Sequence, residues 1–199
     1  ATFKPYSLEQ LTAMGITPFY AVQDMLDKGA KPEDIFVKID KEEYGLRRVY
    51  LNRKYNFIDD ENKLLFDRWF DFADYFKEGF ALVKLNRKYN FINTEGQIAF
   101  NQWFDDAERF HEGFATVQLN NKWNFINTEG RILSKQWFDT AWNFSEGVAR
   151  VELNGKWYNL DKEGNLTLRE SRRSLSPIIT ESIIEKIKSE CIKRLMDIK

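Results

Sequence analysis

The chain has 199 residues, of which 43% are hydrophobic, 16% aromatic and 31% charged, so it is long and apolar enough for a folded core and is not a disordered chain. Its 30 basic and 31 acidic side chains give a net charge of −1, which argues against non-specific binding to duplex DNA or to an anionic membrane. Because Cys191 and His111 are its only cysteine and histidine, and no run of 18 apolar residues is present, we expect no metal site, no cofactor and no membrane span.

Residues 1–44 predict a domain of two short helices. The first, over 7–14, begins at a capping box, and the second, over 19–27, follows a proline and ends before Gly29. A short strand is expected at 35–39. A helix-turn-helix is the alternative, but the second helix has no Lys or Arg to contact DNA. We therefore expect this domain to be a helical N-terminal cap on the residues that follow.

Residues 45–168 contain a repeat with a period of 34 residues, because the octapeptide 51–58 recurs residue for residue at 85–92. Nothing is inserted or deleted between successive copies. Such regular repetition predicts a tandem array in which each unit buries apolar surface against its neighbours. The predicted units are 45–78, 79–112, 113–146 and a truncated fourth, 147–168.

Each unit is predicted to be a three-stranded antiparallel meander with two turns. The first turn pairs Asn with a second residue in a two-residue type I′ loop, where positive φ angles are needed. If Asn86 and Arg87 form such a loop, Leu85 faces Lys88 and Lys84 faces Tyr89. We expect a mainly β fold built as an open solenoid or spiral, with a small propeller as the alternative. The second turns end at residues that tolerate a left-handed conformation, namely Asn62, Gly96, Gly130 and Gly164.

The array resembles the WG repeat, a bacterial and phage family, in three motifs between Phe110 and Ala141. Residues 110–115 match F-x-E-G-[LF]-A, 120–127 match N-G-K-W-G-[FY]-I-[DN], and 136–141 match Q-[FW]-F-D-x-A. The resemblance covers Gly45 to about Leu168, and it implies a β-repeat scaffold that acts as a binding module and has no catalytic residues. The family's glycine after the aromatic residue is replaced by Asn56, Asn90, Asn124 and Tyr158. Asparagine suits a bulge or left-handed position as glycine does, but tyrosine does not, so we expect the fourth unit to differ in geometry.

Residues 169–199 predict a basic linker and then an amphipathic helix over 178–199. Cys191 lies on its apolar stripe and is expected to be a core residue, not a nucleophile. Two roles remain open for the helix. It docks on the last repeat, or it makes the protein a homo-oligomer as a dimerisation helix.

The candidate catalytic groups indicate a protein that is not an enzyme. Asp71, Asp105 and Asp139 recur once per unit, as structural groups do, whereas acid–base catalysis needs one pair in one cleft. His111 has no counterpart in the other units, and we expect it to lie in a solvated loop. No phosphate-binding glycine loop or nucleophile motif is present.

Basic and aromatic residues lie side by side at each first hairpin, and Arg47 and Arg48 belong to the same basic cluster in the first unit. A cation beside a π face is able to hold a base and a phosphate. The alternative is structural, because a lysine stem also covers a neighbouring ring. The predicted ligand-binding residues are Arg53, Lys54, Tyr55, Arg87, Lys88, Tyr89, Lys122, Trp123, Lys156 and Trp157.

Three functions follow from these features as hypotheses. The first is a non-catalytic interaction scaffold that presents an aromatic and basic repeat face to a protein partner, in bacteria or phage. The second is a phage-type sponge that sequesters a small anionic, nucleotide-like signalling ligand in counter-defence against the host. The third is a structural component of a virion or surface. We expect a cytoplasmic location, in the host cytoplasm if a phage encodes the chain.

Overall fold

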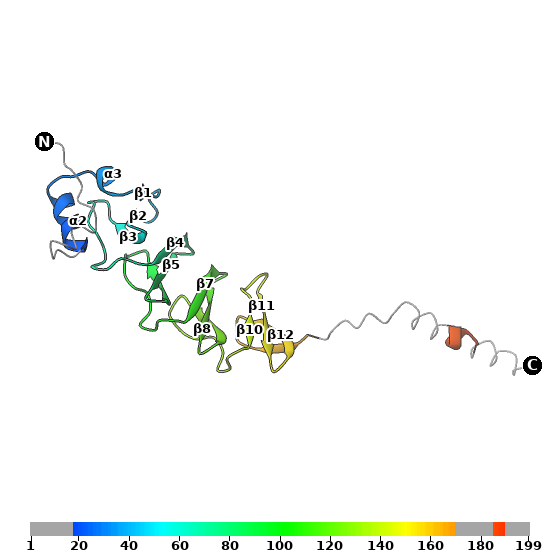
Figure 1. The fold of residues 1–199 in the computed structure, drawn as a ribbon. Helices are drawn as coiled ribbons and strands as arrows, with labels where there is room; N and C mark the ends of the chain where they lie inside the picture. The colour runs from blue at the N-terminus through cyan, green and yellow to red at the C-terminus, as the bar shows by residue number, and fades with distance from the viewer. Residues whose placement is uncertain (1–17, 170–184, 190–199) are drawn as a thin grey trace, which may run out of the picture. The chain divides into compact units, whose positions relative to one another are not determined.

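The computed structural model of the chain describes residues 18–169 and 185–189 (Figure 1). The chain divides into two compact units, Ala1–Leu168 and Arg169–Lys199. In the second unit, residues 185–189 are helical, and the rest of the helix predicted over 178–199 lies outside the described residues, as does the helix predicted over 7–14. Within the described part, no helix is long and apolar enough to cross a membrane.

The first unit begins with helix α2 (Pro18–Asp27), which packs against the first sheet. Val22 and Met25 of this helix are buried in one cluster with Val49 and Ile58 of the sheet. Gln23 adds a polar contact, since its side-chain oxygen accepts a hydrogen bond of 2.9 Å from the backbone N–H of Leu64. The helix therefore covers the apolar face that the first sheet exposes at the start of the array.

The strand expected at 35–39 is shorter than predicted. Ile35 ends a one-turn helix, α3 (Pro32–Ile35), and its side chain is buried against the first sheet. The strand itself is β1 (Lys38–Ile39), which pairs with the strand that contains Val49. Proline at the first helical position favours the helical turn that shortened the strand.

Four antiparallel sheets then follow one another in chain order (Figure 1), which confirms the mainly β fold and the tandem meanders. The first three sheets have three strands each, and the fourth has four. Contacts join each sheet to the next, and within residues 18–169 no ladder closes the array into a barrel. The sheets are β1, β2 (Arg47–Leu51) and β3 (Lys54–Ile58); β4 (Phe72–Lys77), β5 (Phe80–Leu85) and β6 (Lys88–Asn93); β7 (Asp106–His111), β8 (Phe114–Leu119) and β9 (Lys122–Asn127); and β10 (Thr140–Ala141), β11 (Val148–Leu153), β12 (Lys156–Asp161) and β13 (Leu166–Leu168).

Both predicted turns are confirmed by their backbone angles. Asn86 and Arg87 have φ values of 50° and 66°, as a type I′ turn requires, and the other first turns repeat this pattern. In the second turn Gly96 has a φ of 72°, and a Cβ atom there would lie 2.6 Å from the Leu65 side chain. Glycine therefore serves both the backbone conformation and the close packing of the preceding repeat.

Each sheet is shifted relative to the predicted units, because a third type of turn lies at the unit boundary. Glu78 and Gly79 have φ values of 51° and 83° and form a two-residue hairpin between β4 and β5. The strand at the end of one predicted unit is thus the first strand of the next sheet. A bulge lies in this strand between Ala73 and Phe76, and such irregularity protects an outer strand from pairing with other chains.

Phenylalanine pairs form the core between successive sheets. The ring centroids of Phe91 in β6 and Phe110 in β7 lie 5.1 Å apart, edge to face. Equivalent pairs join the other sheets, with Phe57 at 6.0 Å from Phe76 and Phe125 at 5.0 Å from Phe144. Such pairs add to the stabilisation from burial, which is how one unit stabilises the next.

The asparagines that replace the family's glycine do not adopt a left-handed conformation, so that expectation is wrong. Asn90 lies in register opposite Val83 and is fully buried. Its side-chain nitrogen donates hydrogen bonds of 2.7 Å and 3.2 Å to the carbonyl oxygens of Phe100 and Gln102, and its side-chain oxygen accepts one from the N–H of Phe91. The amide therefore binds the loop after the sheet to the sheet itself. Asn56 and Asn124 make the same contacts.

The fourth unit keeps the register despite Tyr158. This residue pairs with Val151 of β11 on one side and with Leu168 of β13 on the other. The predicted difference in geometry lies in the segment that follows the hairpin and not in the hairpin register, because Tyr158 itself requires neither a bulge nor a positive φ. A regular strand, β13, pairs with β12 where the earlier sheets form isolated bridges.

Candidate functional site

The predicted site residues divide between two faces of each sheet. Lys84 pairs with Tyr89 and Leu85 pairs with Lys88, which confirms the predicted hairpin register. Because successive side chains of a strand point to opposite faces, Lys88 and Tyr89 do not share a surface. The same separation holds for the pairs Lys54 and Tyr55, Lys122 and Trp123, and Lys156 and Trp157.

Lysines of the first three hairpins form ion pairs within the array. Lys88 donates to the carboxylate of Asp105, whose second oxygen accepts a hydrogen bond of 2.7 Å from the N–H of Asn120 in the next hairpin. The hydrogen bond from Lys88 and then that from Asn120 hold the pKa of Asp105 below its ordinary value. Equivalent contacts link Lys54, Asp71 and Asn86, and Lys122, Asp139 and Asn154.

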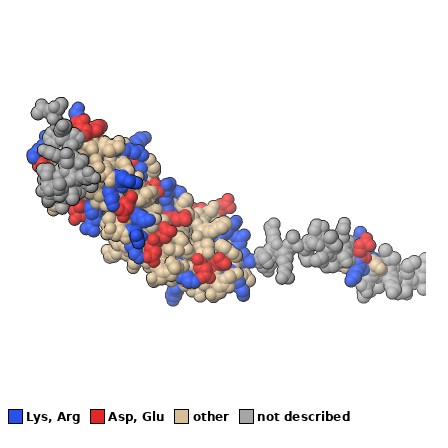
Figure 2. Space-filling view, in the orientation of Figure 1, with Lys and Arg blue, Asp and Glu red and all other residues tan. Residues whose placement is uncertain are grey.

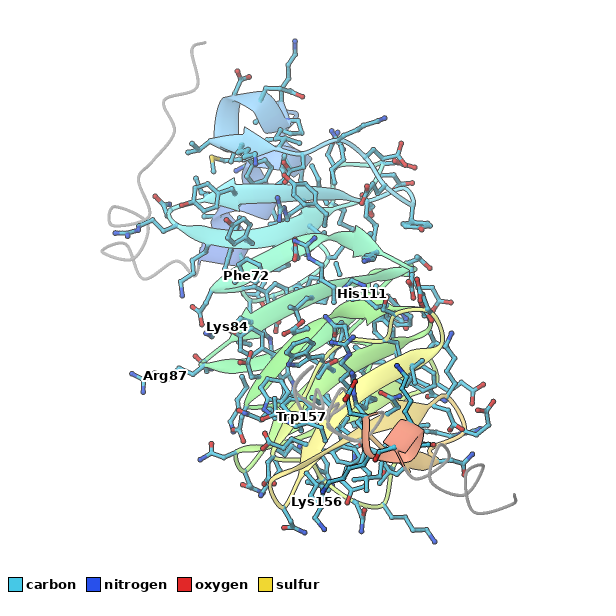
Figure 3. All side chains as sticks on the ribbon, turned by 90° about the vertical axis from the view of Figure 1, so that its right-hand side faces the viewer. Phe72, Lys84, Arg87, His111, Lys156 and Trp157 are labelled. Carbon is cyan, nitrogen blue, oxygen red and sulfur yellow. The ribbon has the colours of Figure 1, made fainter. Side chains whose placement is uncertain are left out.

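Arg53 and Arg87, each the second residue of a first turn, and Lys156 of the last hairpin are exposed to solvent. Arg53 and Arg87 are exposed at the hairpin tips, and Figure 3 shows Arg87 extending away from the ribbon. Lys156 is exposed and has no ion pair within the described residues. The ligand-binding role of these residues remains a prediction.

A cluster of aromatic rings surrounds one arginine on the first two sheets. The guanidinium carbon of Arg48 lies 4.1 Å from the ring centroid of Tyr75 and 5.2 Å from that of Tyr55. The ring of Tyr55 in turn lies 4.9 Å from Tyr50 and 6.3 Å from Phe72, between centroids. We call this surface the tyrosine patch, and it consists of Arg48, Tyr50, Tyr55, Phe72 and Tyr75.

Hydrogen bonds fix the arginine at the centre of the tyrosine patch. The Nε of Arg48 donates to Asp40 at 2.6 Å, and its Nη1 donates to the carbonyl oxygen of Ala73 in the next sheet. Burial raises the pKa of Asp40, but hydrogen bonds from Arg48 and Lys38 outweigh it, so that this pKa lies below its ordinary value. The charged pair thus holds the guanidinium in place beside the rings.

The tyrosine patch continues into a second row of side chains. Phe72 pairs with Lys84 across β4 and β5, and both are labelled in Figure 3. The ammonium of Lys84 lies 4.6 Å from the centroid of the Tyr89 ring and 2.9 Å from its hydroxyl oxygen. Tyr55 and Tyr89, two of the predicted site residues, therefore contact cations that come from the opposite strand of the hairpin.

Phe72 and Tyr75 belong to the tyrosine patch although they are not among the sequence-predicted site residues. The exposed fraction of Tyr75 is 49% and that of Phe72 is 38%, the largest in the patch. Both lie on β4, which belongs to the first predicted unit but pairs with β5 of the second. The sequence signal for this patch is the predicted facing of Lys84 and Tyr89. It indicates that a cation contacts a ring on the paired strand, and not the ring next to it in the sequence.

A pocket of about 330 Å³ lies between the second and third sheets. His111 lines it from β7, half-buried, with its Nδ1 3.0 Å from the ammonium of Lys77, so the expectation of a solvated loop is wrong. Arg109 also lines the pocket and makes a bidentate ion pair with the buried carboxylate of Asp74. Basic, acidic and imidazole side chains from two repeats therefore meet in one cavity.

Acidic side chains do not gather into a catalytic or metal-binding cluster in the part of the chain that is described. Asp71, Asp105 and Asp139 each hold a lysine and a hairpin N–H, so each has a structural role. No group of three or more His, Cys, Asp or Glu side chains is placed to hold a metal ion within residues 18–169 and 185–189. Figure 2 shows basic and acidic residues interspersed on the visible face.

Comparison with solved structures shows low similarity to several proteins. Hsv2 of Kluyveromyces lactis matches with a TM-score of 0.41 and 9% identity, over 69% of this chain and 50% of that chain. A protein of unknown function from Bacteroides caccae matches with a TM-score of 0.29 and 18% identity, over 57% of this chain and 52% of that chain. A plant lectin with two metal binding sites from Cicer arietinum has a TM-score of 0.27 and 11% identity, over 69% of this chain and 94% of that chain. The chain spans about half the length of Hsv2.

Comparison with protein families gives a match within the array. A comparison with curated proteins finds no match. The WG containing repeat matches three consecutive segments, 57–89, 91–123 and 125–157. Each segment runs from the third strand of one sheet, starting at Phe57, Phe91 or Phe125, into the third strand of the next sheet, and each is directly preceded by a buried asparagine. The chain therefore belongs to the family of proteins that contain WG repeats.

Proposed function

We propose that the chain is a non-catalytic binding protein that presents the tyrosine patch to a protein partner. The observation that carries this proposal is the placement of Arg48 between the rings of Tyr55 and Tyr75, beside the exposed Phe72. Tyrosine and arginine are enriched at the energetic centres of protein interfaces, where large rings bury much area with few rotatable bonds.

Order within the tyrosine patch supports the same proposal. Asp40 and the carbonyl of Ala73 already fix Arg48, and Tyr55 lies between Tyr50 and Phe72. A partner that docks here therefore immobilises few additional side chains, which lowers the entropic penalty of association. Lys84, which borders the patch opposite Phe72, favours a partner whose docking surface is acidic at its rim.

The test uses the full chain as an immobilised bait, with a quantitative comparison between variants. The double variant Phe72→Ser with Tyr75→Ser removes the two most exposed rings of the patch, and Ile132→Ser removes an equally exposed apolar side chain elsewhere, since Ile132 is 39% exposed. We expect the patch variant to weaken capture of a specific partner by about a hundredfold, because two interface anchors are lost. Equal capture by the patch variant and by Ile132→Ser rules the proposal out.

The pocket between the second and third sheets supports a second candidate, a protein that sequesters a small anionic, nucleotide-like ligand. Its volume of about 330 Å³ lies at the lower end of the range for small-ligand sites, and Lys77, Arg109 and His111 line it together with Asp74 and Glu108. A phage would use such a protein against a host signal. Nucleotides, cyclic and linear, are expected to raise the melting temperature by mass action, and Lys77→Gln is expected to remove that shift. A flat response to the whole panel excludes this candidate.

A further inference from the structure

The outer face of the fourth sheet differs from the equivalent face of the other sheets. In the first three sheets this face carries Phe57, Phe91 and Phe125, each covered by a phenylalanine of the next sheet. In the fourth sheet the equivalent residue is Asn159, one period after Phe125. Within residues 18–169 no further sheet follows it.

Charged side chains alternate along β11 on this face. Arg150 pairs with Asn159 across the hairpin and is exposed, whereas at the equivalent position Leu82 and Thr116 are buried and Arg48 of the first sheet is half-buried. Glu152 lies two residues further along the same face and accepts a hydrogen bond of 3.1 Å from the hydroxyl of Thr140. Arg150 has no carboxylate partner among the described residues. The face therefore presents the positive charge of Arg150 next to the negative charge of Glu152.

A pair of tryptophans, Trp142 exposed and Trp157 half-buried, completes the surface. Trp142 is 54% exposed, its ring centroid lies 5.9 Å from that of Trp157, and the guanidinium of Arg150 lies 5.6 Å from its ring. The residues equivalent to Trp142 in the second and third sheets, Asp74 and Glu108, are acidic and bind the following repeat. Asp74 accepts from Arg109, and Glu108 accepts from Asn143 at 2.5 Å.

We propose that this terminal face, made of Trp142, Arg150, Glu152, Trp157 and Asn159, docks on the same face of a second copy of the chain. The polar residues alone would suffice to end the array in water, but they do not account for the exposed ring of Trp142 between Trp157 and Arg150, which is the composition of an interface anchor. In a two-fold arrangement with the β11 strands antiparallel, Arg150 of each copy lies opposite Glu152 of the other. The face is thus complementary to itself in charge.

The opposite end of the array does not offer a comparable surface. Helix α2 covers the first sheet there, with Val22 and Met25 buried against Val49. A surface at one end only, paired with itself, gives a closed dimer and not a filament. This inference is independent of the tyrosine patch, which lies on the first two sheets.

Charge exchange in the full chain tests the pairing of Arg150 with Glu152. Arg150→Glu alone and Glu152→Arg alone place like charges opposite each other, and we expect each to raise the dimer dissociation constant at least about tenfold. The double variant Arg150→Glu with Glu152→Arg restores both pairs and is expected to dimerise like the natural chain. An equimolar mixture of the two single variants is expected to form heterodimers. Sedimentation velocity over a range of concentrations measures all four.

Trp142→Ser is expected to weaken the dimer at least about tenfold, because an interface anchor is lost. The matched control is Tyr75→Ser, which removes a ring of similar exposure from the tyrosine patch and is expected to leave the dimer unchanged. Circular dichroism checks that each variant is folded. The proposal is overturned if the natural chain is monomeric at every concentration, or if its dimer withstands both single charge reversals.

Discussion

The carboxylate of Glu112 accepts a hydrogen bond of 2.9 Å from the backbone N–H of Gly147, in the turn of the following repeat. Its other oxygen accepts one of 2.6 Å from the N–H of Glu146. One repeat earlier, Glu78 makes the same two contacts with Glu112 and Gly113. Each glutamate thus lies in one left-handed turn and holds the next, which explains why the Glu-Gly pair recurs with the period of the array.

Replacing Glu112 by alanine is expected to lower the melting temperature by about 2 °C, because two N–H groups of the next turn lose a charged acceptor. The matched control is Glu146→Ala, since the Glu146 carboxylate accepts no hydrogen bond from the described residues. Differential scanning calorimetry compares the two variants. An equal effect of both substitutions contradicts a role for the glutamate ladder.

Replacing Asn90 by alanine is expected to destabilise the fold by about 2–4 kcal/mol, because the buried carbonyl of Phe100 and the partly buried carbonyl of Gln102 lose their donor. Asn101→Ala, in the exposed loop of the same repeat, is expected to stay within about 0.5 kcal/mol of the natural chain. Urea denaturation measures both values. A variant at Asn90 as stable as the one at Asn101 is incompatible with the amide contacts described above.

Phe91→Ala is expected to destabilise the array by about 3–5 kcal/mol, because the ring is fully buried between Phe100 and Phe110. Phe72→Ala removes the same group from a position that is 38% exposed and is expected to have a much smaller effect. The comparison uses the urea midpoint of each variant. Similar midpoints for the two would contradict the stacking of the second sheet on the third.

The ion pairs along the array predict a loss of stability in acid. The hydrogen bond from its lysine holds the pKa of Asp71, and likewise that of Asp105, below the ordinary value. A carboxyl whose pKa is lower in the folded state stabilises the fold fully above its unfolded pKa of about 3.9, and this contribution is lost as the pH falls through the folded pKa. The melting temperature is therefore expected to fall steeply below about pH 4.

The triple variant Asp71→Asn, Asp105→Asn and Asp139→Asn tests the origin of that loss. It is expected to melt lower at neutral pH and to show a shallower decline between about pH 5 and pH 3, because three of the titrating groups are gone. Calorimetry at a series of pH values gives both slopes. Parallel pH profiles for the variant and the natural chain would mean that other carboxyl groups control the acid transition.

The turns and the hairpin register could be predicted from the sequence because they depend on neighbouring residues. Asn86 and Arg87 form the expected loop, and the facing of Lys84 and Tyr89 follows directly from it. The Glu-Gly hairpins were missed because glutamate is not a typical residue for a positive φ, and the contact that stabilises it comes from another repeat.

The contacts between repeats could not be predicted, because they join residues that are far apart in the sequence. Lys88 reaches an aspartate 17 positions later, and Arg109 reaches Asp74 across 35 positions. For the same reason the predicted site grouped Lys88 with Tyr89, its neighbour along the strand, although the ring contacts Lys84 from the opposite strand.

Photo-crosslinking from inside the tyrosine patch is the most direct test of a repeat array that binds a partner through this surface. A benzophenone amino acid is placed at position 75, and in a second protein at position 132, since Tyr75 and Ile132 are both exposed. A specific covalent adduct with one partner from position 75, and none from position 132, is the predicted result. Adducts of equal yield from both positions, or an adduct from position 132 alone, would contradict it.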